Sequence, residues 1–320
     1  MIARGPAPFN IDPFLNRTWL LRDQLAAFSA NFTANTVPLA AIIEPAIIPQ
    51  AYSDLDLRTG IILEGDDITS SLLNQSLEYF QKALYNFKVH YLLAKEGYKT
   101  WASVTNYYSS YFSLFSLLSL QGRAITRVKV NGVTDTVCLL HPTDFRAHRY
   151  ILTNKENRDS THKLPWKKYY EIYDSYGLLK PEFDVVQLKR FNALPIDETE
   201  ERNKINYKIF EGFQEVVSLT SLVAFQTQYL DALITPILGA PINDFLTALK
   251  YLATDPDLKY FARSALRLIL IRSIFEEVAR INGNFASELI IRVPLWQTTL
   301  FDVYAPPINY YEDFIRTFVN

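Results

Sequence analysis

The sequence is poor in the residues on which several common kinds of site depend. It holds one cysteine, Cys138, which excludes an intramolecular disulfide and a cysteine-based zinc site. Glycine is scarce, with 10 in 320 residues, and this argues against glycine-rich phosphate loops and many tight hairpins. The four histidines, His90, His141, His148 and His162, show no metal-site spacing. We therefore expect neither a metal ion nor another cofactor.

The chain also lacks a dominant charge and a long apolar run. Its net charge of −2 provides no overall basic field that would attract nucleic acid, although a local basic patch is compatible with it. The longest apolar stretch, residues 107–120, is shorter than the roughly 20 residues that span a bilayer, and serines interrupt it. The N-terminus has no apolar run typical of a signal peptide. We expect a cytoplasmic protein that does not enter a membrane.

Several sequence motifs of enzymes are missing. There is no Gly-x-x-x-x-Gly-Lys, Gly-x-Gly-x-x-Gly, His-Glu-x-x-His or Gly-x-Ser-x-Gly. This lowers the expectation of nucleotide hydrolysis, dinucleotide chemistry, zinc proteolysis and α/β-hydrolase activity. What is present is 49% hydrophobic residues and 21% charged residues, the composition of an ordinary folded protein.

The spacing of apolar residues predicts a mainly α-helical chain. Residues 66–96 carry apolar side chains at intervals of 4-3-4-3-4, beginning after an expected N-cap at Asp66. Residues 107–120 form a second expected helix, which stops at Gly122 and whose serines let neighbouring helices approach closely. The connection between them is short, so they should form an antiparallel hairpin. Further helices are expected at 13–33, 166–176, 200–234, 242–254, 257–282 and 307–319.

Other stretches favour strands or irregular structure. Pro38, Pro45 and Pro49 interrupt residues 34–63, which predicts short strands or an extended arm. Alternating residues flank Asn131-Gly132, the strongest short-range signal of a β-hairpin, and predict a hairpin inserted at 123–140. Residues 141–201 are expected to be largely irregular, and the apolar runs at 288–293 and 299–304 are candidate strands. The expected domains are a helix with a Pro-rich arm at 1–65, a helical core at 66–235 and a C-terminal helical extension at 236–320.

Two short stretches resemble the HEPN domain superfamily. The residues Asn106-Tyr107-Tyr108-Ser109-Ser110-Tyr111-Phe112, with a second apolar turn and Gly122 after them, are similar to a Tyr-Tyr-Ala/Phe helix found in an uncharacterised branch. The residues Arg202-Asn203-Lys204-Ile205-Asn206-Tyr207 resemble the Arg-polar motif that begins a later helix. The resemblance covers about residues 66–233 and implies a HEPN-like helical bundle, usually dimeric.

The resemblance implies metal-independent RNA cleavage in a prokaryotic defence or toxin-type system. It assigns Arg202 to the scissile phosphate, Asn203 to its orientation and Tyr207 to an assisting role. The histidine of the family pattern is absent here, and tyrosine, with a pKa near 10, is a poor general base. The alternative is a catalytically degenerate subunit that binds or assembles with a protein encoded nearby. Arg202 as a solvated residue at a helix start also remains open, as does a structural protein with no nucleic-acid role.

A basic segment at 146–168 provides a second set of candidate residues. Its cations are interleaved with Tyr150 and Trp166, and this combination suits phosphates and stacked bases. The candidate RNA contacts are Arg146, Arg149, Arg158, His162, Lys167 and Lys168. An exposed polar loop without such a role is the competing interpretation.

Overall fold

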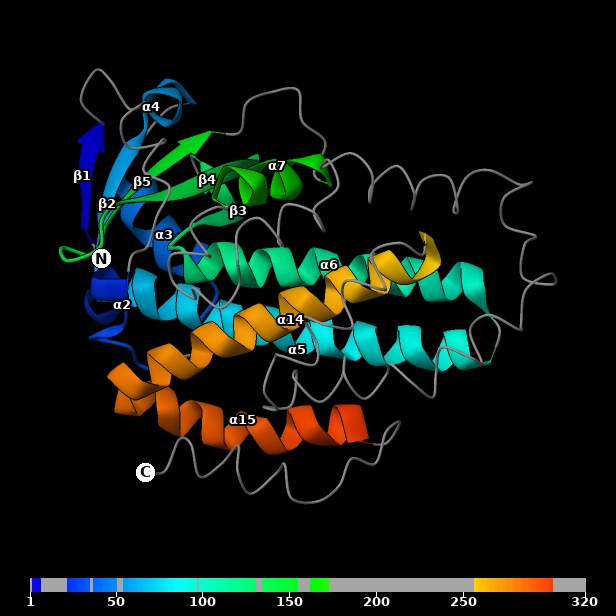
Figure 1. Ribbon diagram of the computed structural model, residues 1–320. Coiled ribbons are helices and arrows are strands. Elements are labelled where there is room, and N and C mark those ends of the chain that lie inside the picture. The colour runs from blue at the N-terminus through cyan, green and yellow to red at the C-terminus, as the bar shows by residue number, and fades with distance from the viewer. Residues whose placement is uncertain are drawn as a thin grey trace. The chain divides into compact units, whose positions relative to one another are not determined.

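The computed structural model describes residues 2–6, 22–34, 37–50, 54–96, 98–130, 134–154, 162–172 and 256–301 (Figure 1). These ranges contain eight α-helices and five strands, which confirms a mainly helical protein. The chain divides into two compact units. Unit 1 comprises Met1–Glu78, Phe115–Pro181 and Glu277–Glu288; unit 2 comprises Tyr79–Leu114, Glu182–Glu276 and Leu289–Asn320. Within the described ranges, no helix combines the length and the apolar character needed to cross a bilayer.

Unit 1 contains an antiparallel sheet with the strand order β1-β2-β5-β4-β3 (Figure 1). The hairpin expected at 123–140 is confirmed, with Val130 of β3 opposite Thr134 of β4. It is not an isolated insert, because β5 pairs with both β4 and β2. The expectation of irregular structure after residue 140 is therefore wrong for 149–154, where buried residues such as Ile151 and Leu152 favour a strand. The strands are β1 (Ile2–Pro6), β2 (Ile61–Glu64), β3 (Ala124–Val130), β4 (Thr134–Asp144) and β5 (Arg149–Asn154).

The Pro-rich arm is more helical than expected. Only β2 is a strand; the rest of the described arm forms α3 (Leu39–Ile47), the 3-10 turn η1 (Ile48–Gln50) and α4 (Asp54–Thr59). Leu39, Ile43 and Ile47 recur every four residues on α3 and are buried. Pro45 is exposed and removes one helical hydrogen bond, so the burial of this apolar face outweighs the loss. Preceding this arm, α2 (Arg22–Ser29) lies within the helix expected at 13–33.

The two longest predicted helices are confirmed as α5 (Asp66–Lys95) and α6 (Lys99–Leu120). Ser76 and Ser116 meet between them: each hydroxyl donates to the other residue's backbone carbonyl, at 3.0 and 2.9 Å. Tyr79 stacks on Phe112, so residue numbers fall along α6 as they rise along α5 and the pair is antiparallel. The serines do allow close approach, as expected from the sequence.

Gly122 ends α6 in the way the sequence predicts. Its φ of 69° is in the left-handed region, and a Cβ there would lie 2.9 Å from Cε1 of Phe145. The N–H of Arg123 then donates to the carbonyl of Leu118 at 2.9 Å, which satisfies one of the last helical carbonyls. A side chain at position 122 would be strained and crowded at once.

Asn282 separates α14 (Pro256–Ile281) from α15 (Gly283–Phe301). Its Oδ1 accepts the N–H of Phe285 at 2.8 Å, which is the N-cap bond of α15, and its Nδ2 donates to the carbonyl of Ser29 at 2.7 Å. The helix expected at 257–282 is confirmed, whereas the strand expected at 288–293 is wrong. The cap and the buried residues Phe285, Leu289 and Val293, four residues apart, favour a helix. Of the candidate strand at 299–304, residues 299–301 are helical, and the remaining residues lie outside the described ranges.

The described core of unit 2 contains a group of packed aromatic rings and a group of hydrogen-bonded serine hydroxyls. Phe80 packs edge-on against Phe275 and Trp296, with ring centroids 5.3 and 4.9 Å apart. Ser110 of α6 lies 2.6 Å from the hydroxyl of Ser264 and accepts a hydrogen bond from buried Arg267 at 2.8 Å. The serines of α6 thus serve packing in this unit as well.

Of the remaining predicted helices, one falls on described residues and three do not. The helix α7 (Lys163–Ile172) overlaps the helix expected at 166–176. The helices expected at 200–234, 242–254 and 307–319 lie outside the described residues. The three-domain division stays a prediction.

Candidate functional site

The residues assigned by resemblance to RNA cleavage cannot be placed from the structure. Arg202, Asn203 and Tyr207 lie outside the described ranges, as does Arg158 of the basic segment. Their roles therefore stay predictions. The remaining five candidate RNA contacts fall on two elements, the β4–β5 turn and α7 with the residue before it.

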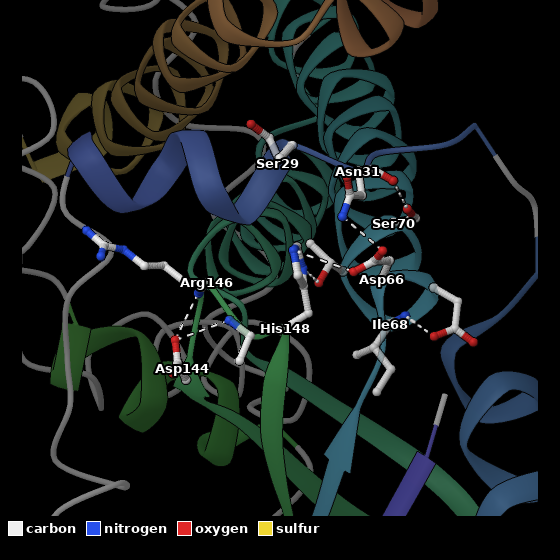
Figure 2. A network of polar contacts seen from close by, with 12 residues as sticks. Ser29, Asn31, Asp66, Ile68, Ser70, Asp144, Arg146 and His148 are labelled. Atoms are coloured by element: carbon white, nitrogen blue, oxygen red, sulfur yellow. Dashed lines mark hydrogen bonds and ion pairs between the residues drawn. The ribbon is translucent and has the colours of Figure 1, made fainter.

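The β4–β5 turn carries Arg146 and Arg149. Arg146 is exposed, and its backbone N–H donates to the carboxylate of Asp144 at 2.9 Å, so an Asp side chain shapes the turn (Figure 2). Arg149 begins β5, and its Nε lies 3.4 Å from Oε2 of Glu64 on the paired strand. The turn therefore presents one exposed cation and one that is partnered by a carboxylate.

Helix α7 carries the other group. Lys167 is exposed, while Nζ of Lys168 lies 3.0 and 3.1 Å from the two carboxylate oxygens of Glu171. His162 directly precedes the helix and is half-buried. This part of the segment is a folded helix, so the interpretation of 146–168 as a continuous exposed loop is wrong for α7 and for β5.

A connected set of polar contacts lies where the β4–β5 turn meets the start of α5 (Figure 2). The hydroxyl of Thr69 is 2.8 Å from Nδ1 of His148 and 2.6 Å from the phenol oxygen of Tyr150. Nε2 of His148 is 3.5 Å from Oδ1 of Asp66. The second carboxylate oxygen of Asp66 accepts a hydrogen bond from Nδ2 of Asn31 at 2.9 Å.

The protonation of Tyr150 favours one direction of donation along these contacts. Burial, with smaller contributions from the charges of Asp66 and Asp67, raises the pKa of Tyr150, so its phenol stays protonated and donates to Thr69. Thr69 can then donate to Nδ1 of His148 in the tautomer that carries its proton on Nε2, the nitrogen that lies 3.5 Å from Oδ1 of Asp66. The result is one continuous chain from a buried phenol to a half-exposed carboxylate, whose side chain is 53% exposed.

The backbone of His148 is strained. Its φ of 46° makes it the one residue other than glycine with a positive φ in the described ranges. Such a conformation costs about 1–2 kcal/mol, so the contacts around the residue must hold it in place. One of them is a backbone bond from the N–H of Gly65 to the carbonyl of His148 at 3.1 Å. The turn is therefore fastened to the start of α5 through both the main chain and the side chain of His148.

A carboxylate, an imidazole and a hydroxyl in series are the parts of a nucleophile-activating triad. The hydroxyl at the end of this series belongs to Thr69, which is only 2% exposed. A substrate has no access to it, so the network positions the turn and its exposed Arg146 rather than attacking a substrate.

Sequence reasoning missed this network because its two halves are far apart in the chain. Asp66 was expected to cap α5, but its carboxylate contacts Asn31 and His148 instead. The N–H of Ile68 is taken by the carboxylate of Asp67 at 3.0 Å. No local pattern around His148 points to Asp66 or Thr69, so the sequence offered no signal for the contact.

Two other histidines have a lowered pKa: His90, which is half-buried, and His141, which is buried. Nδ1 of His90 donates to the carbonyl of Ala102 at 2.6 Å, and burial lowers the pKa of His90 to about 4. Burial, then the charges of Arg123 and Lys168, lowers the pKa of His141 well below its usual range. Neither adds positive charge to the basic segment. The described ranges contain no group of His, Cys, Asp and Glu that could hold a metal ion.

Comparison with known proteins adds no relative. No family model matches the sequence, and neither the curated proteins nor the solved structures give a match. A function for this chain must therefore be argued from its own residues and geometry.

Proposed function

We propose that this protein acts on RNA as a HEPN-like, metal-independent ribonuclease of a prokaryotic defence or toxin-type system. The observation that carries the proposal is the antiparallel α5–α6 pair. Its second helix contains the Tyr-Tyr-Ser-Ser-Tyr-Phe stretch, and its serines join it to α5 at Ser76 and Ser116. Both helices fall within residues 66–233, which the resemblance covers, and an antiparallel pair is compatible with the helical bundle that the resemblance implies.

The proposed chemistry uses residues 202–207. Arg202 holds the scissile phosphate through paired charge-assisted hydrogen bonds, and Asn203 orients it. Tyr207, or a residue of a second chain, assists the attack of the ribose 2′-hydroxyl on the phosphorus, in which the 2′-hydroxyl gives up its proton, the bond to the 5′-oxygen of the next nucleotide breaks and that oxygen leaves with a proton. His90 and His141, both with a lowered pKa, do not supply the histidine that the family pattern has and this sequence lacks.

A second candidate function is a catalytically degenerate subunit of a multi-protein complex, with a nearby-encoded protein or a second copy of the chain as partner. The specific observation in its favour is on α15, where Ile291 is 71% exposed and Leu295, one turn later, is 50% exposed. Neighbouring exposed aliphatic side chains are typical of a surface that another protein covers. The missing histidine points in the same direction.

Cleavage of labelled total RNA in the presence of a chelator tests the proposal. Wild type, Arg202→Ala and the control Arg127→Ala, which removes an exposed arginine of β3, are purified side by side. We expect wild type and the control to cleave and Arg202→Ala to lose at least about 100-fold in rate, as expected when a group that stabilises transition-state charge is removed. Circular dichroism checks that all three are folded.

Two outcomes contradict the proposal. Equal cleavage by all three proteins would show that Arg202 takes no part in the reaction. No cleavage by wild type would favour the assembly subunit, and co-purification with proteins encoded nearby would then be the next measurement.

A further inference from the structure

The exposed aromatic side chains of the described residues are gathered in one short stretch. Three aromatic residues are exposed, Tyr85 at 60%, Tyr98 at 52% and Trp101 at 61%, and all belong to unit 2. The described Trp166 and Trp296 are, by contrast, 1% and 5% exposed. Burial of a large aromatic ring is usually favourable. Three exposed rings within 17 residues therefore indicate a surface that a binding partner covers.

Lysines accompany these rings. Lys82 and Lys88 lie three residues before and after Tyr85, which places them on the same side of α5. From Tyr79 to Trp101 the sequence has four lysines and one acidic residue, Glu96, in a chain whose net charge is −2. Nζ of Lys82 lies 5.5 Å from the ring centroid of Tyr79, a cation–π contact that keeps the ammonium on this surface.

Two of the exposed side chains share one face of α5. Leu92, 38% exposed, is seven residues after Tyr85, so the two share a face of α5 about 10 Å apart. Tyr98 and Trp101 follow at the turn that joins α5 to α6, where the two helices end together in Figure 1. We name these six residues the aromatic strip: Lys82, Tyr85, Lys88, Leu92, Tyr98 and Trp101.

The mixture of rings and lysines identifies the kind of partner. Protein interfaces are enriched in Tyr and Trp, but lysine is depleted from them. Surfaces that bind unpaired nucleic acid combine both, because rings stack on exposed bases while cations contact the phosphates. A lysine on each side of Tyr85 therefore favours a polynucleotide over a protein partner.

We propose that the aromatic strip binds single-stranded RNA, with Tyr85, Tyr98 and Trp101 stacking on unpaired bases and Lys82 and Lys88 contacting phosphates. The inference rests on the proposed function and deepens it, since it names unpaired RNA as the substrate class. The strip lies outside the basic segment 146–168, so it adds a contact surface that the sequence motifs did not indicate.

Fluorescence anisotropy with labelled oligonucleotides tests the strip. The probes are an oligo(U) of about 12 nucleotides, an RNA duplex of equal length and an oligo(dT) of equal length. The variants are Tyr85→Ala, Trp101→Ala and Trp101→Phe, and the control Val37→Ala removes an apolar side chain that is 48% exposed and lies outside the strip. We expect Tyr85→Ala and Trp101→Ala to weaken oligo(U) binding about 5- to 100-fold, with Trp101→Phe close to wild type, because stacking needs only a ring. Val37→Ala should match wild type.

The possible results distinguish a failure of the inference about the strip from a failure of the proposed function. If wild type binds RNA and the strip variants bind equally well, the inference is overturned while the RNA role stands. If wild type binds no RNA, the proposed function itself fails. Tighter binding of the duplex than of oligo(U) would overturn the assignment to unpaired bases, and tighter binding of oligo(dT) would overturn the assignment to RNA.

Discussion

Burial lowers the pKa of two of the described histidines, His90 and His141. The imidazole of His90 is enclosed next to the ring of Phe261, and its Nδ1–H is used by the carbonyl of Ala102. His141 is 2% exposed, and its Nδ1 lies 3.4 Å from a guanidinium nitrogen of Arg123. Their sequence neighbours do not reveal this. Four histidines look equivalent in the sequence, and only the fold reveals the burial that lowers the pKa of His90 and of His141.

His90 should make the stability of the protein depend on pH. Its pKa of about 4 in the folded state is below the ordinary value of about 6.5, so the unfolded chain binds more protons between these values. This contribution is complete above about pH 6.5 and declines as the pH falls towards 4. Gln at position 90 keeps an N–H donor for Ala102 and does not titrate. We expect His90→Gln to flatten the loss of unfolding free energy between about pH 6.5 and 4, measured by urea denaturation at several pH values.

The same experiment has a clear contrary result. If wild type and His90→Gln lose unfolding free energy with the same slope, the imidazole is not held neutral by the fold. The comparison of slopes also removes the effect of other titrating groups, His141 included, because both proteins share them.

At the scale of secondary-structure elements, long amphipathic patterns were predictable and short apolar runs were not. α5 and α14 have periodic apolar faces over many turns, and both were found where the spacing placed them. The run Leu289-Ile290-Ile291-Arg292-Val293 has the β-branched content of a strand, yet it is helical because Asn282 caps α15 and Leu289 and Val293 are buried. Such decisions depend on tertiary contacts that a local pattern does not contain.

The junction between the β4–β5 turn and α5 is another contact of this kind. The turn was visible in the sequence only as part of a basic segment, since Arg146 and Arg149 stand on each side of His148. What fixes it is the left-handed His148 and its partners Asp66 and Thr69, which lie far earlier in the chain. The sequence offered the basic residues as candidates, a role that stays a prediction, whereas it gave no sign of the network that fixes the turn.

Two substitutions at position 148 should differ sharply. Asn adopts the left-handed region and can keep a side-chain acceptor near Thr69, so His148→Asn should lose less than about 1 kcal/mol of unfolding free energy. Val is β-branched and accepts no hydrogen bond, so His148→Val should lose about 2–4 kcal/mol from strain and from the unpaired hydroxyls. Urea denaturation at neutral pH measures both values. Equal losses would mean that neither the φ of 46° nor the hydrogen bond to Thr69 matters for stability.

For the molecule as a whole, charge is nearly balanced and its placement is what matters. The sequence has 32 basic Lys and Arg residues and 34 acidic residues. In the basic segment, Arg149 and Lys168 each lie against a glutamate, which lowers what they can offer to a phosphate. The aromatic strip has a local excess of lysine in a chain without an overall basic field. Any affinity for RNA should therefore come from a few local contacts and not from long-range attraction.

The salt dependence of RNA binding measures how many phosphates the protein contacts. For single strands, the slope of log K against log salt is about −0.7 for each phosphate neutralised. The double variant Lys82→Gln/Lys88→Gln should make the slope for oligo(U) shallower by about 1.4, because both ammonium groups are proposed to contact phosphates. The control Arg127→Gln/Lys129→Gln removes the same charge from exposed positions of β3 and should leave the slope unchanged. Equal changes in both proteins would mean that RNA responds to the total charge of the molecule, and the strip would lose its special role.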